Sequence, residues 1–530
     1  MPSAVAAGTR SSSHLVFHFM ERALVRTLLL KMLPGTGSQV HERLPGLRAR
    51  PVRRESTNTT QSTTECCHET FACPRLPEFD PMTGSLRKSL DEGPMNRFQW
   101  AAVSVCVLLN MLDGFDVLVM SFTGKAVMAE WDLSGAQLGL LLSAGLVGMA
   151  AGSMLLAPWA DRVGRRPMIL LCLAIASAGL LLSSVSQSAT QLGALRIATG
   201  VGIGGILASS NVIASEYASR RWRGLVVSLN STGYALGATL GGLVSVVLLA
   251  EFGWRAVFLF GGVATAVGIP VVFALLPESL DFLLARRPAR ALDKVNQLTR
   301  KLGLPTLDHL PAAPVVQAGV GAGFRKLLSS DLRRASFLLW TAFFLVMAGF
   351  YFVTSWTPTL LTKAGLSTAQ GVTGGTLLNL GGIFGATLLG LLAARFALRS
   401  VLIAYALSTA VMLGVFIAAT SSLAAALVLG AAIGVAVNGC VAGLYALTPI
   451  IYDSGVRATG VGAAIGIGRI GAIAAPAVAG ALLDVGWTPQ SLYLTVGVVF
   501  AATAVLLLLL RPAVAAEPKP APATSAQSTN

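Results

Sequence analysis

The sequence predicts an all-α integral membrane protein whose twelve transmembrane helices form two pseudo-symmetric halves of six. Of its 530 residues, 54% are hydrophobic and only 12% are charged, and 56 are glycines that suit close contacts between helices. Apolar runs long enough to cross a bilayer recur in two sets of six. Lysines and arginines gather between these runs as topology signals, so the net charge of +15 does not indicate a nucleic-acid partner.

The expected spans follow from apolar runs of about 20 residues, taken in chain order. The first set covers 98–122, 137–159, 167–186, 190–214, 225–249 and 255–276. The second set covers 336–360, 371–394, 399–418, 422–447, 457–483 and 489–510. We therefore expect an N-terminal half over 95–276, a central loop over 277–335 and a C-terminal half over 336–511.

Basic residues in the connections predict the orientation in the membrane. One side carries most of them, in the stretches 162–166 and 220–223, in the central loop, and at Arg395, Arg399 and Arg457. The other side carries little beyond Lys125, Arg255 and Lys363. Because basic loops stay in the cytoplasm, we expect both termini and the central loop to be cytoplasmic.

The two ends of the chain, 1–94 and 512–530, lack an apolar run of spanning length and are expected to be disordered. Arginines in the leader imitate an organelle transit peptide, but Met82 or Met95 looks like a natural start. We therefore interpret residues 1–81 as a mis-assigned upstream extension. The leader also holds a cluster that matches no zinc spacing, formed by Cys66, Cys67, His68 and Cys73, and we expect neither a metal nor a cofactor.

Two carboxylates, Asp113 and Asp116, lie inside the first apolar run. Residues three apart on a helix share a face, and each charge at bilayer depth costs about 2.5–3.5 kcal/mol on insertion scales. One interpretation is structural, with the aspartates capping a helix break at Gly114 or pairing with buried cations. The interpretation that we favour is a protonatable pair that lines a polar pathway.

The two halves repeat each other's motifs, as duplicated transporter folds do. The stretch from Asp161 to Arg166 follows the second span, and the stretch from Ala394 to Arg399 follows the eighth in register. The second copy keeps arginines at the second and sixth positions, Arg395 and Arg399, but lacks the acid and the inner glycine. Each half also places an arginine beside a face of glycines, Arg196 in the fourth span and Arg469 in the eleventh.

Over about residues 97–511 the chain resembles the major facilitator superfamily. The stretch from Asp161 to Arg166 matches that superfamily's signature between spans two and three, although Ala157 replaces its first glycine. Pro277-Glu278-Ser279 ends span six as in its sugar and organic-acid branches. Shorter motifs look like the aromatic acid:proton symporters, which carry 4-hydroxybenzoate or benzoate: Asp113-Gly114-Phe115-Asp116, Ser215-Glu216-Tyr217, the stretch 350–358 and Gly468-Arg469-Ile470-Gly471-Ala472.

For such a carrier, Arg469 is the best candidate to bind a substrate carboxylate. A guanidinium stays charged when buried and can hold a carboxylate with two hydrogen bonds; the alternative is that Arg469 ties helices together through backbone carbonyls. Arg196 either belongs to the substrate or proton path or forms a structural ion pair with Asp113 or Asp116. Phe115 and Tyr351 are candidates for contacts to an aromatic ring, and each also suits ordinary packing.

A second group of residues is expected to act in gating. The resemblance implies that the signature loop closes the cytoplasmic side through Asp161, Arg162, Gly164, Arg165 and Arg166, although the charges by themselves show only a dense cluster. Glu216 ends the fourth span and is expected to pair with Arg220, Arg221 or this loop. Gating therefore suits Glu216 better than substrate contact.

The resulting hypothesis is a secondary active transporter, not an enzyme. It would import a small aromatic carboxylate with protons by alternating access, as a monomer in the lipid bilayer and without a nucleic-acid partner. The alternatives are a proton-coupled carrier of another organic anion or of a sugar acid, and an exporter of the same fold. A membrane enzyme is disfavoured because the membrane body carries no metal spacing and no nucleophile with a base.

Overall fold

The structure is a computed structural model that describes residues 89–310, 325–416, 418–452 and 456–510. All of them belong to one unit, Pro77–Asn530. The expectations for the leader up to residue 88 with its cysteine cluster, and for the tail from residue 511, lie outside the described residues, as do residues 311–324 of the expected central loop.

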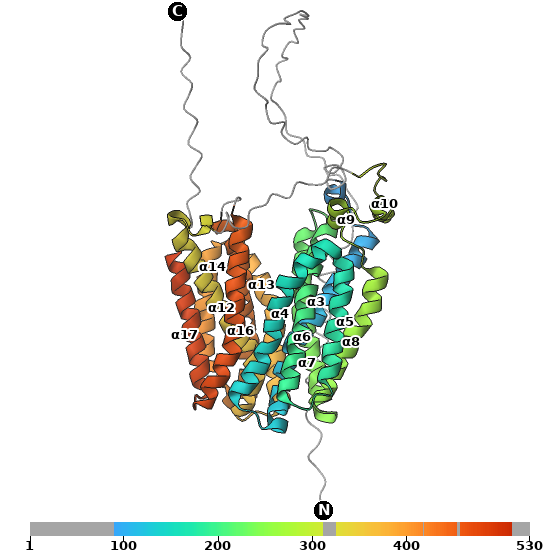
Figure 1. The fold of residues 1–530 in the computed structure, drawn as a ribbon. Coiled ribbons are helices and arrows are strands. Elements are labelled where there is room, and N and C mark those ends of the chain that lie inside the picture. The colour runs from blue at the N-terminus through green and yellow to red at the C-terminus, as the bar shows by residue number, and fades with distance from the viewer. Residues whose placement is uncertain (1–88, 311–324, 417, 453–455, 511–530) are drawn as a thin grey trace, which may run out of the picture. The chain divides into compact units, whose positions relative to one another are not determined.

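Six long helices form the first half (Figure 1). They are α3 (Arg97–Trp131), α4 (Gly135–Val163), α5 (Arg165–Ser183), α6 (Ala189–Tyr217), α7 (Arg223–Glu251) and α8 (Trp254–Leu275). Two short helices follow in the central loop, α9 (Leu280–Arg286) and α10 (Ala291–Leu302), and they lie at one end of the first half in Figure 1. We call this end, which also carries the arginines of 162–166 and 220–223, the basic end.

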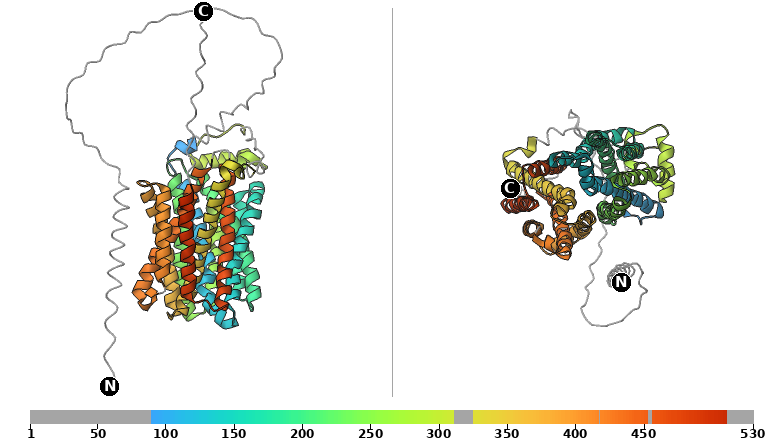
Figure 2. Two further views of the ribbon diagram at one scale, coloured as in Figure 1. Left: turned by 90° about the vertical axis from the view of Figure 1, so that its left-hand side faces the viewer. Right: turned by 90° about the horizontal axis from the view of Figure 1, so that it is seen from below.

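Six further long helices form the second half, with one 3-10 turn between them. They are α12 (Ser330–Lys363), α13 (Thr368–Ala393), α14 (Leu398–Phe416), η1 (Ala418–Ser421), α15 (Leu423–Ile451), α16 (Arg457–Asp484) and α17 (Pro489–Leu509). In the end-on view of Figure 2 these helices, in yellow to red, group beside the blue and green helices of the first half.

The predicted membrane class is confirmed within the described ranges. Twelve helices there are long and apolar enough to cross a membrane. The largest extensions beyond the predicted apolar runs are in α3, which continues to Trp131, and in α12, which already begins at Ser330. The extensions carry exposed Lys125 in α3 and exposed Arg333 and Arg334 in α12, whose long basic side chains reach toward water from a helical backbone.

Local sequence explains where equivalent helices begin in the two halves. The second helix of the first half, α4, starts with a capping box in which the Ser134 hydroxyl accepts from the Gln137 N–H while the Gln137 side chain accepts from the Ser134 N–H. The second helix of the other half, α13, starts with the same arrangement between Ser367 and Gln370. Both pairs satisfy N–H groups that the first helical turn leaves without partners.

Helix packing repeats between the halves. In the first half α3 packs on α7, α4 on α6, and α5 on α8. The corresponding helices of the second half pack in the same pairs, α12 on α16, α13 on α15, and α14 on α17. The duplication that the loop motifs indicated therefore extends to the tertiary contacts.

The two halves meet along α4 with α16, α7 with α13, and α3 with α12. Near the end remote from the basic end, α4 and α16 approach backbone to backbone: a Cβ added to Gly480 would lie 2.1 Å from the Gly135 carbonyl oxygen. Nearer the basic end on the same helix, a Cβ added to Gly462 or Gly466 would meet no atom of the described residues within 4 Å. The structure therefore closes the remote end and leaves this part of α16 uncovered.

A carboxylate joins the halves at the closed end. Asp484, the last residue of α16, accepts hydrogen bonds through Oδ1 from the Gly135 N–H at 2.6 Å and through Oδ2 from the Ala136 N–H at 2.8 Å. These N–H groups open α4, so the carboxylate of one half caps the positive end of a helix in the other. Because the contact crosses between the halves, it stabilises the closed state of this end specifically.

We expect Asp484→Ala to shift the protein toward states that are open at this end. The lost cap is partly exposed, and we expect it to be worth about 1 kcal/mol, or roughly a fivefold change in the ratio of the two states. Electron spin distance measurements between labels at Asp132 and Gln490 would detect the shift as a larger population of long distances. Glu130→Gln is the matched control, because Glu130 binds Trp254 and Arg255 within the first half. An unchanged distance distribution in Asp484→Ala would contradict the prediction.

Candidate functional site

The interior of the first half contains a buried ion pair between Asp116 on α3 and Arg196 on α6. The Arg196 Nη1 donates to Asp116 Oδ1 at 2.8 Å, and Nη2 donates to Asp116 Oδ2 at 3.1 Å and to the Asp116 carbonyl oxygen at 2.8 Å. Both residues are 2% exposed, and the guanidinium lies over the Phe258 ring. Gly145 on α4 leaves room for it, since a Cβ there would lie 3.3 Å from Nη2. The two charges thus compensate each other.

Asp113, one turn away on α3, has a different environment. Its side chain is 1% exposed, and its Oδ1 accepts no hydrogen bond from any residue that the structure describes. Its charged neighbours are Arg469 across the interface between the halves and Asp116 on its own helix. The spacing of the two aspartates predicts a pair, but the structure pairs Asp116 with a cation and leaves Asp113 Oδ1 without a hydrogen-bond donor among the described residues.

Arg469 approaches Asp113 from α16. The helix packs tightly on α12, where a Cβ on Gly471 would lie 2.3 Å from the Phe344 carbonyl oxygen. This contact brings the half-buried Arg469 beside Tyr351 of α12, and its Nη1 donates to the Tyr351 hydroxyl at 3.3 Å. No ion pair joins Arg469 to Asp113 in the described part of the chain, although the two interact electrostatically.

Two further tyrosines complete the surroundings of Arg469, Tyr234 on α7 and Tyr445 on α15. Tyr234 is absent from the site that the sequence predicts. Its helix approaches α3 so closely that a Cβ on Gly114 would lie 1.9 Å from the Tyr234 carbonyl oxygen, which places the tyrosine beside Asp113. The glycines at 233, 237 and 241 indicate close packing of this helix. A tyrosine within that glycine pattern is the sequence signal from which Tyr234 could have been predicted as a site residue.

We call Asp113, Tyr234, Tyr351, Tyr445 and Arg469 the central cluster. It draws one residue from each of five helices and combines one cation, one carboxylate and three phenols. Phe115 does not join it. Its ring packs between α7 and α8, where a Cβ on Gly241 or Gly261 would lie 2.2 or 2.3 Å from ring atoms, and it contacts Phe260 edge to face.

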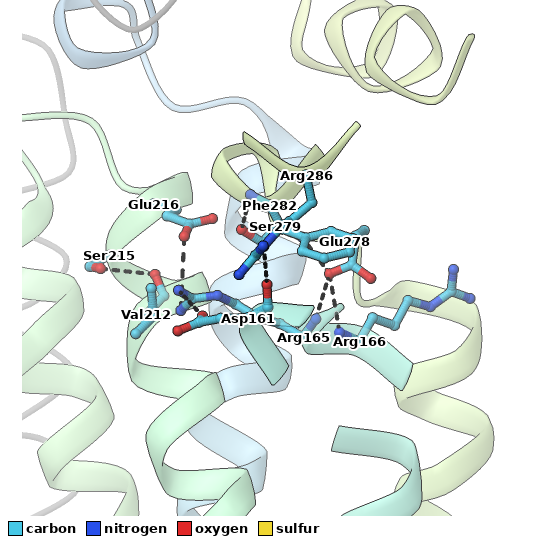
Figure 3. Close-up of polar contacts among 10 residues, drawn as sticks. All are labelled: Asp161, Arg165, Arg166, Val212, Ser215, Glu216, Glu278, Ser279, Phe282 and Arg286. Atoms are coloured by element: carbon cyan, nitrogen blue, oxygen red, sulfur yellow. Dashed lines mark hydrogen bonds and ion pairs between the residues drawn. The ribbon is translucent and has the colours of Figure 1, made fainter. Parts of the chain in front are cut away.

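A second polar network lies at the basic end, around the signature loop (Figure 3). Arg165 Nη2 donates to Asp161 Oδ1 at 3.1 Å, and Arg165 Nη1 lies 3.9 Å from a carboxylate oxygen of Glu216. Arg286 of α9 donates through Nε to the Asp161 carbonyl oxygen at 3.1 Å. Glu216 thus lies near Arg165 of the signature loop, which is one of the partners expected for it. The Arg162 side chain is exposed.

Glu278 organises this network, although the sequence motifs include it only as part of a helix ending. Its Oε1 accepts from the N–H groups of Arg165 at 2.9 Å, Arg166 at 3.2 Å and Ser279 at 2.9 Å, so it caps the start of α5 (Figure 3). Gly164 makes this possible, because it adopts a φ of +115° and a Cβ there would lie 2.6 Å from Glu278 Oε2. The position of this acid shortly after α8, the last long helix of the first half, was the sequence signal that could have indicated its role.

The described residues contain no group of three or more His, Cys, Asp and Glu side chains that could hold a metal ion. The central cluster itself combines a guanidinium, a carboxylate and three phenols. A guanidinium can bind an anion, and a buried carboxylate whose Oδ1 accepts no hydrogen bond from the described residues is stabilised by binding a proton.

Comparison with known proteins identifies the class to which this chain belongs. The chain belongs to the Major Facilitator Superfamily, whose family model matches residues 104–389. It is 34% identical to the gallate transporter of Pseudomonas putida, over 79% of this chain and 93% of that protein. It is 31% identical to the 4-hydroxybenzoate transporter PcaK of Acinetobacter baylyi, over 80% of this chain and 94% of that protein. The resemblance to aromatic acid transporters of this superfamily is thus confirmed.

Solved structures agree on the fold. The chain matches a crystal structure of the D-xylose-proton symporter with a TM-score of 0.61 at 18% identity, over 78% of this chain and 98% of that chain. It matches an inward-facing bacterial homologue of the human lysosomal transporter Spinster with a TM-score of 0.58 at 20% identity, over 79% of this chain and 96% of that chain. At this identity the comparison shows the fold alone.

Proposed function

We propose that this protein imports an aromatic carboxylate of the hydroxybenzoate or benzoate type together with protons. The observation that carries the proposal is the half-buried guanidinium of Arg469 inside the membrane body. Among the described residues it hydrogen-bonds to the Tyr351 phenol and lies near Asp113 without forming an ion pair with it. A cation inside the membrane body without a direct ion-pair partner is costly, so a site that keeps one is suited to an anion that comes and goes. The names of the relatives favour an aromatic anion.

In this proposal Asp113 is the residue that couples transport to protons. The Arg196 guanidinium already compensates Asp116, whereas Asp113 has no hydrogen-bond donor among the described residues to stabilise its charge at Oδ1. A proton on Asp113 and a carboxylate on Arg469 together neutralise both buried charges. The fully loaded carrier is then cheaper to reorient than a carrier with only one of the two ligands, and this difference in free energy is the coupling.

Alternating access would use the contacts at the two ends in turn. The structure corresponds to a state closed at the remote end, where Asp484 caps α4 across the halves. In the opposite state the basic end would close around the signature loop, with Asp161, Arg165 and Glu216 as its charged groups. We place this carrier in a bacterial inner membrane as a monomer, with the basic end and both termini in the cytoplasm.

The experiment that tests this function is uptake into proteoliposomes with an imposed inward proton gradient. Radiolabelled 4-hydroxybenzoate, benzoate and a sugar acid are compared, with and without a protonophore. We expect the parent protein to accumulate an aromatic acid and to lose that accumulation with the protonophore. Asp113→Asn cannot release a proton at this position, so we expect its accumulation to fall at least about tenfold, a change of about 1.4 kcal/mol, while exchange of labelled for unlabelled acid continues.

Glu251→Gln, at the exposed end of α7, is the control for removal of an acid. Uptake of the sugar acid without uptake of any aromatic acid would overturn the substrate assignment. Accumulation that withstands the protonophore would overturn the proton coupling. Normal gradient-driven accumulation by Asp113→Asn would move the coupling role away from Asp113.

A further inference from the structure

Three asparagines from three helices form a continuous hydrogen-bonded array in the first half. Asn110 Nδ2 on α3 donates to Asn230 Oδ1 on α7 at 2.8 Å, and Asn230 Nδ2 donates to Asn211 Oδ1 on α6 at 2.5 Å. Asn110 Nδ2 also lies 3.4 Å from the Ser210 hydroxyl. We call Asn110, Asn230 and Asn211 the asparagine array.

The array begins beside the central cluster and ends at an exposed residue. Asn110 precedes Asp113 by three positions on α3, and Asn230 precedes Tyr234 by four on α7, so each lies about one helical turn from a cluster residue. Asn110 and Asn230 are 4% and 2% exposed, whereas Asn211 is exposed. Because α3 and α7 start at the basic end and α6 finishes there, the array lies between Asp113 and that end.

Interhelical hydrogen bonds between amides can serve packing alone, at an average of about 0.6 kcal/mol each in one measured membrane protein. Packing would be served by the buried pair, Asn110 with Asn230. The array instead continues to the exposed Asn211, which turns a buried contact into a polar connection between the interior and the surface. Its inner end lies one turn from the buried carboxylate whose Oδ1 has no partner among the described residues.

We propose that the asparagine array is the route by which Asp113 releases its proton toward the basic end. The inference rests on the proposed function, in which Asp113 takes up a proton from the opposite side. The proton leaves the Asp113 carboxyl for a water molecule and passes along water molecules that hydrogen-bond to Asn110, Asn230 and Asn211, and Asp113 remains as a carboxylate. The amides do not ionise; they supply the donors and acceptors that keep water in an otherwise apolar region.

Other charged and titratable groups also surround Asp113 among the described residues. On α3 and α6, Asp116 and Arg196 bind each other. On α7 Tyr234 is a neighbour, and on α16 Arg469 belongs to the anion site. Arg469 also disfavours movement of a proton past it, because it repels a positive charge.

The test separates proton release from every other step of transport. Net uptake driven by a proton gradient requires that Asp113 lose its proton inside, whereas exchange of labelled for unlabelled 4-hydroxybenzoate uses the loaded carrier in both directions and needs no release. We expect Asn230→Leu, which keeps the volume but removes the amide, to slow net uptake at least tenfold and to change the exchange rate less than twofold. Asn230→Ser leaves room for a water molecule and a hydroxyl to hold it, and is expected to recover net uptake to within threefold of the parent.

Thr239→Val on the same helix is the matched control, since the buried Thr239 hydroxyl donates only to the Ala235 carbonyl oxygen of its own helix. It is expected to leave both rates unchanged. Equal losses of net uptake and exchange in Asn230→Leu would show a packing role and overturn the proposal, as would unchanged net uptake. If the parent protein accumulates the acid without any dependence on protons, the proposed function fails as well, and the two failures are thereby distinguished.

Discussion

Replacing Arg469 by alanine is expected to abolish measurable binding and uptake of the aromatic acid. Truncating one partner of a buried, hydrogen-bonded charge pair costs about 2–5 kcal/mol, which corresponds to a loss of affinity of roughly 30-fold to several thousand-fold. The alanine variant also leaves Asp113 without the nearest cation of the second half. Binding of radiolabelled 4-hydroxybenzoate to detergent-purified protein, followed by uptake in proteoliposomes, measures both effects.

Two further variants make this prediction specific. Arg469→Lys keeps a positive charge but cannot offer two parallel hydrogen bonds, so we expect an affinity between those of the parent and the alanine variant. Arg457→Ala removes an exposed arginine at the start of the same helix and should change uptake less than about twofold, as is usual for an exposed side chain. Binding by Arg469→Ala within threefold of the parent would contradict the assigned anion site and would favour a purely structural role for this arginine.

Arg196→Met is expected to destabilise the protein more than any other single change considered. It removes the partner of Asp116 and leaves a buried carboxylate without compensation, which typically costs about 3–5 kcal/mol. The lost hydrogen bonds connect α3 to α6 through both the carboxylate and the carbonyl group of Asp116. Thermal unfolding in detergent and recovery of monodisperse protein by size-exclusion chromatography would measure this loss.

The double variant Arg196→Met with Asp116→Leu separates stability from transport. Replacing both members of a buried ion pair by apolar residues is often neutral or stabilising, so we expect the double variant to recover the folding that Arg196→Met loses. We also expect it to transport, because the proposed coupling depends on Asp113. A double variant that is well folded but inactive would instead support a direct part for Asp116 in proton coupling or for Arg196 in substrate binding, as the sequence allowed.

The signature loop illustrates how far local sequence carries an interpretation. The order of acid, glycine and arginines between the second and third spans is sufficient to identify the loop as a charged junction. It does not indicate that Glu278, more than a hundred residues later, caps α5 through the N–H groups of Arg165 and Arg166. That contact depends on how α8 returns to the start of α5, and no local pattern encodes such an arrangement.

The sequence by itself determined the twelve spans, the division into two halves and the residue types available for chemistry. A bilayer requires about 20 apolar residues per helix, and a charge placed within such a run is conspicuous, so these features are readable locally. Only the tertiary structure decided which aspartate has a cation. Asp113 and Asp116 are one turn apart on the same helix, and the difference between them arises because Arg196 arrives from α6 beside one and Arg469 from α16 near the other. Tyr234 and the asparagine array became visible for the same reason, since partners far apart in the chain meet only when helices pack.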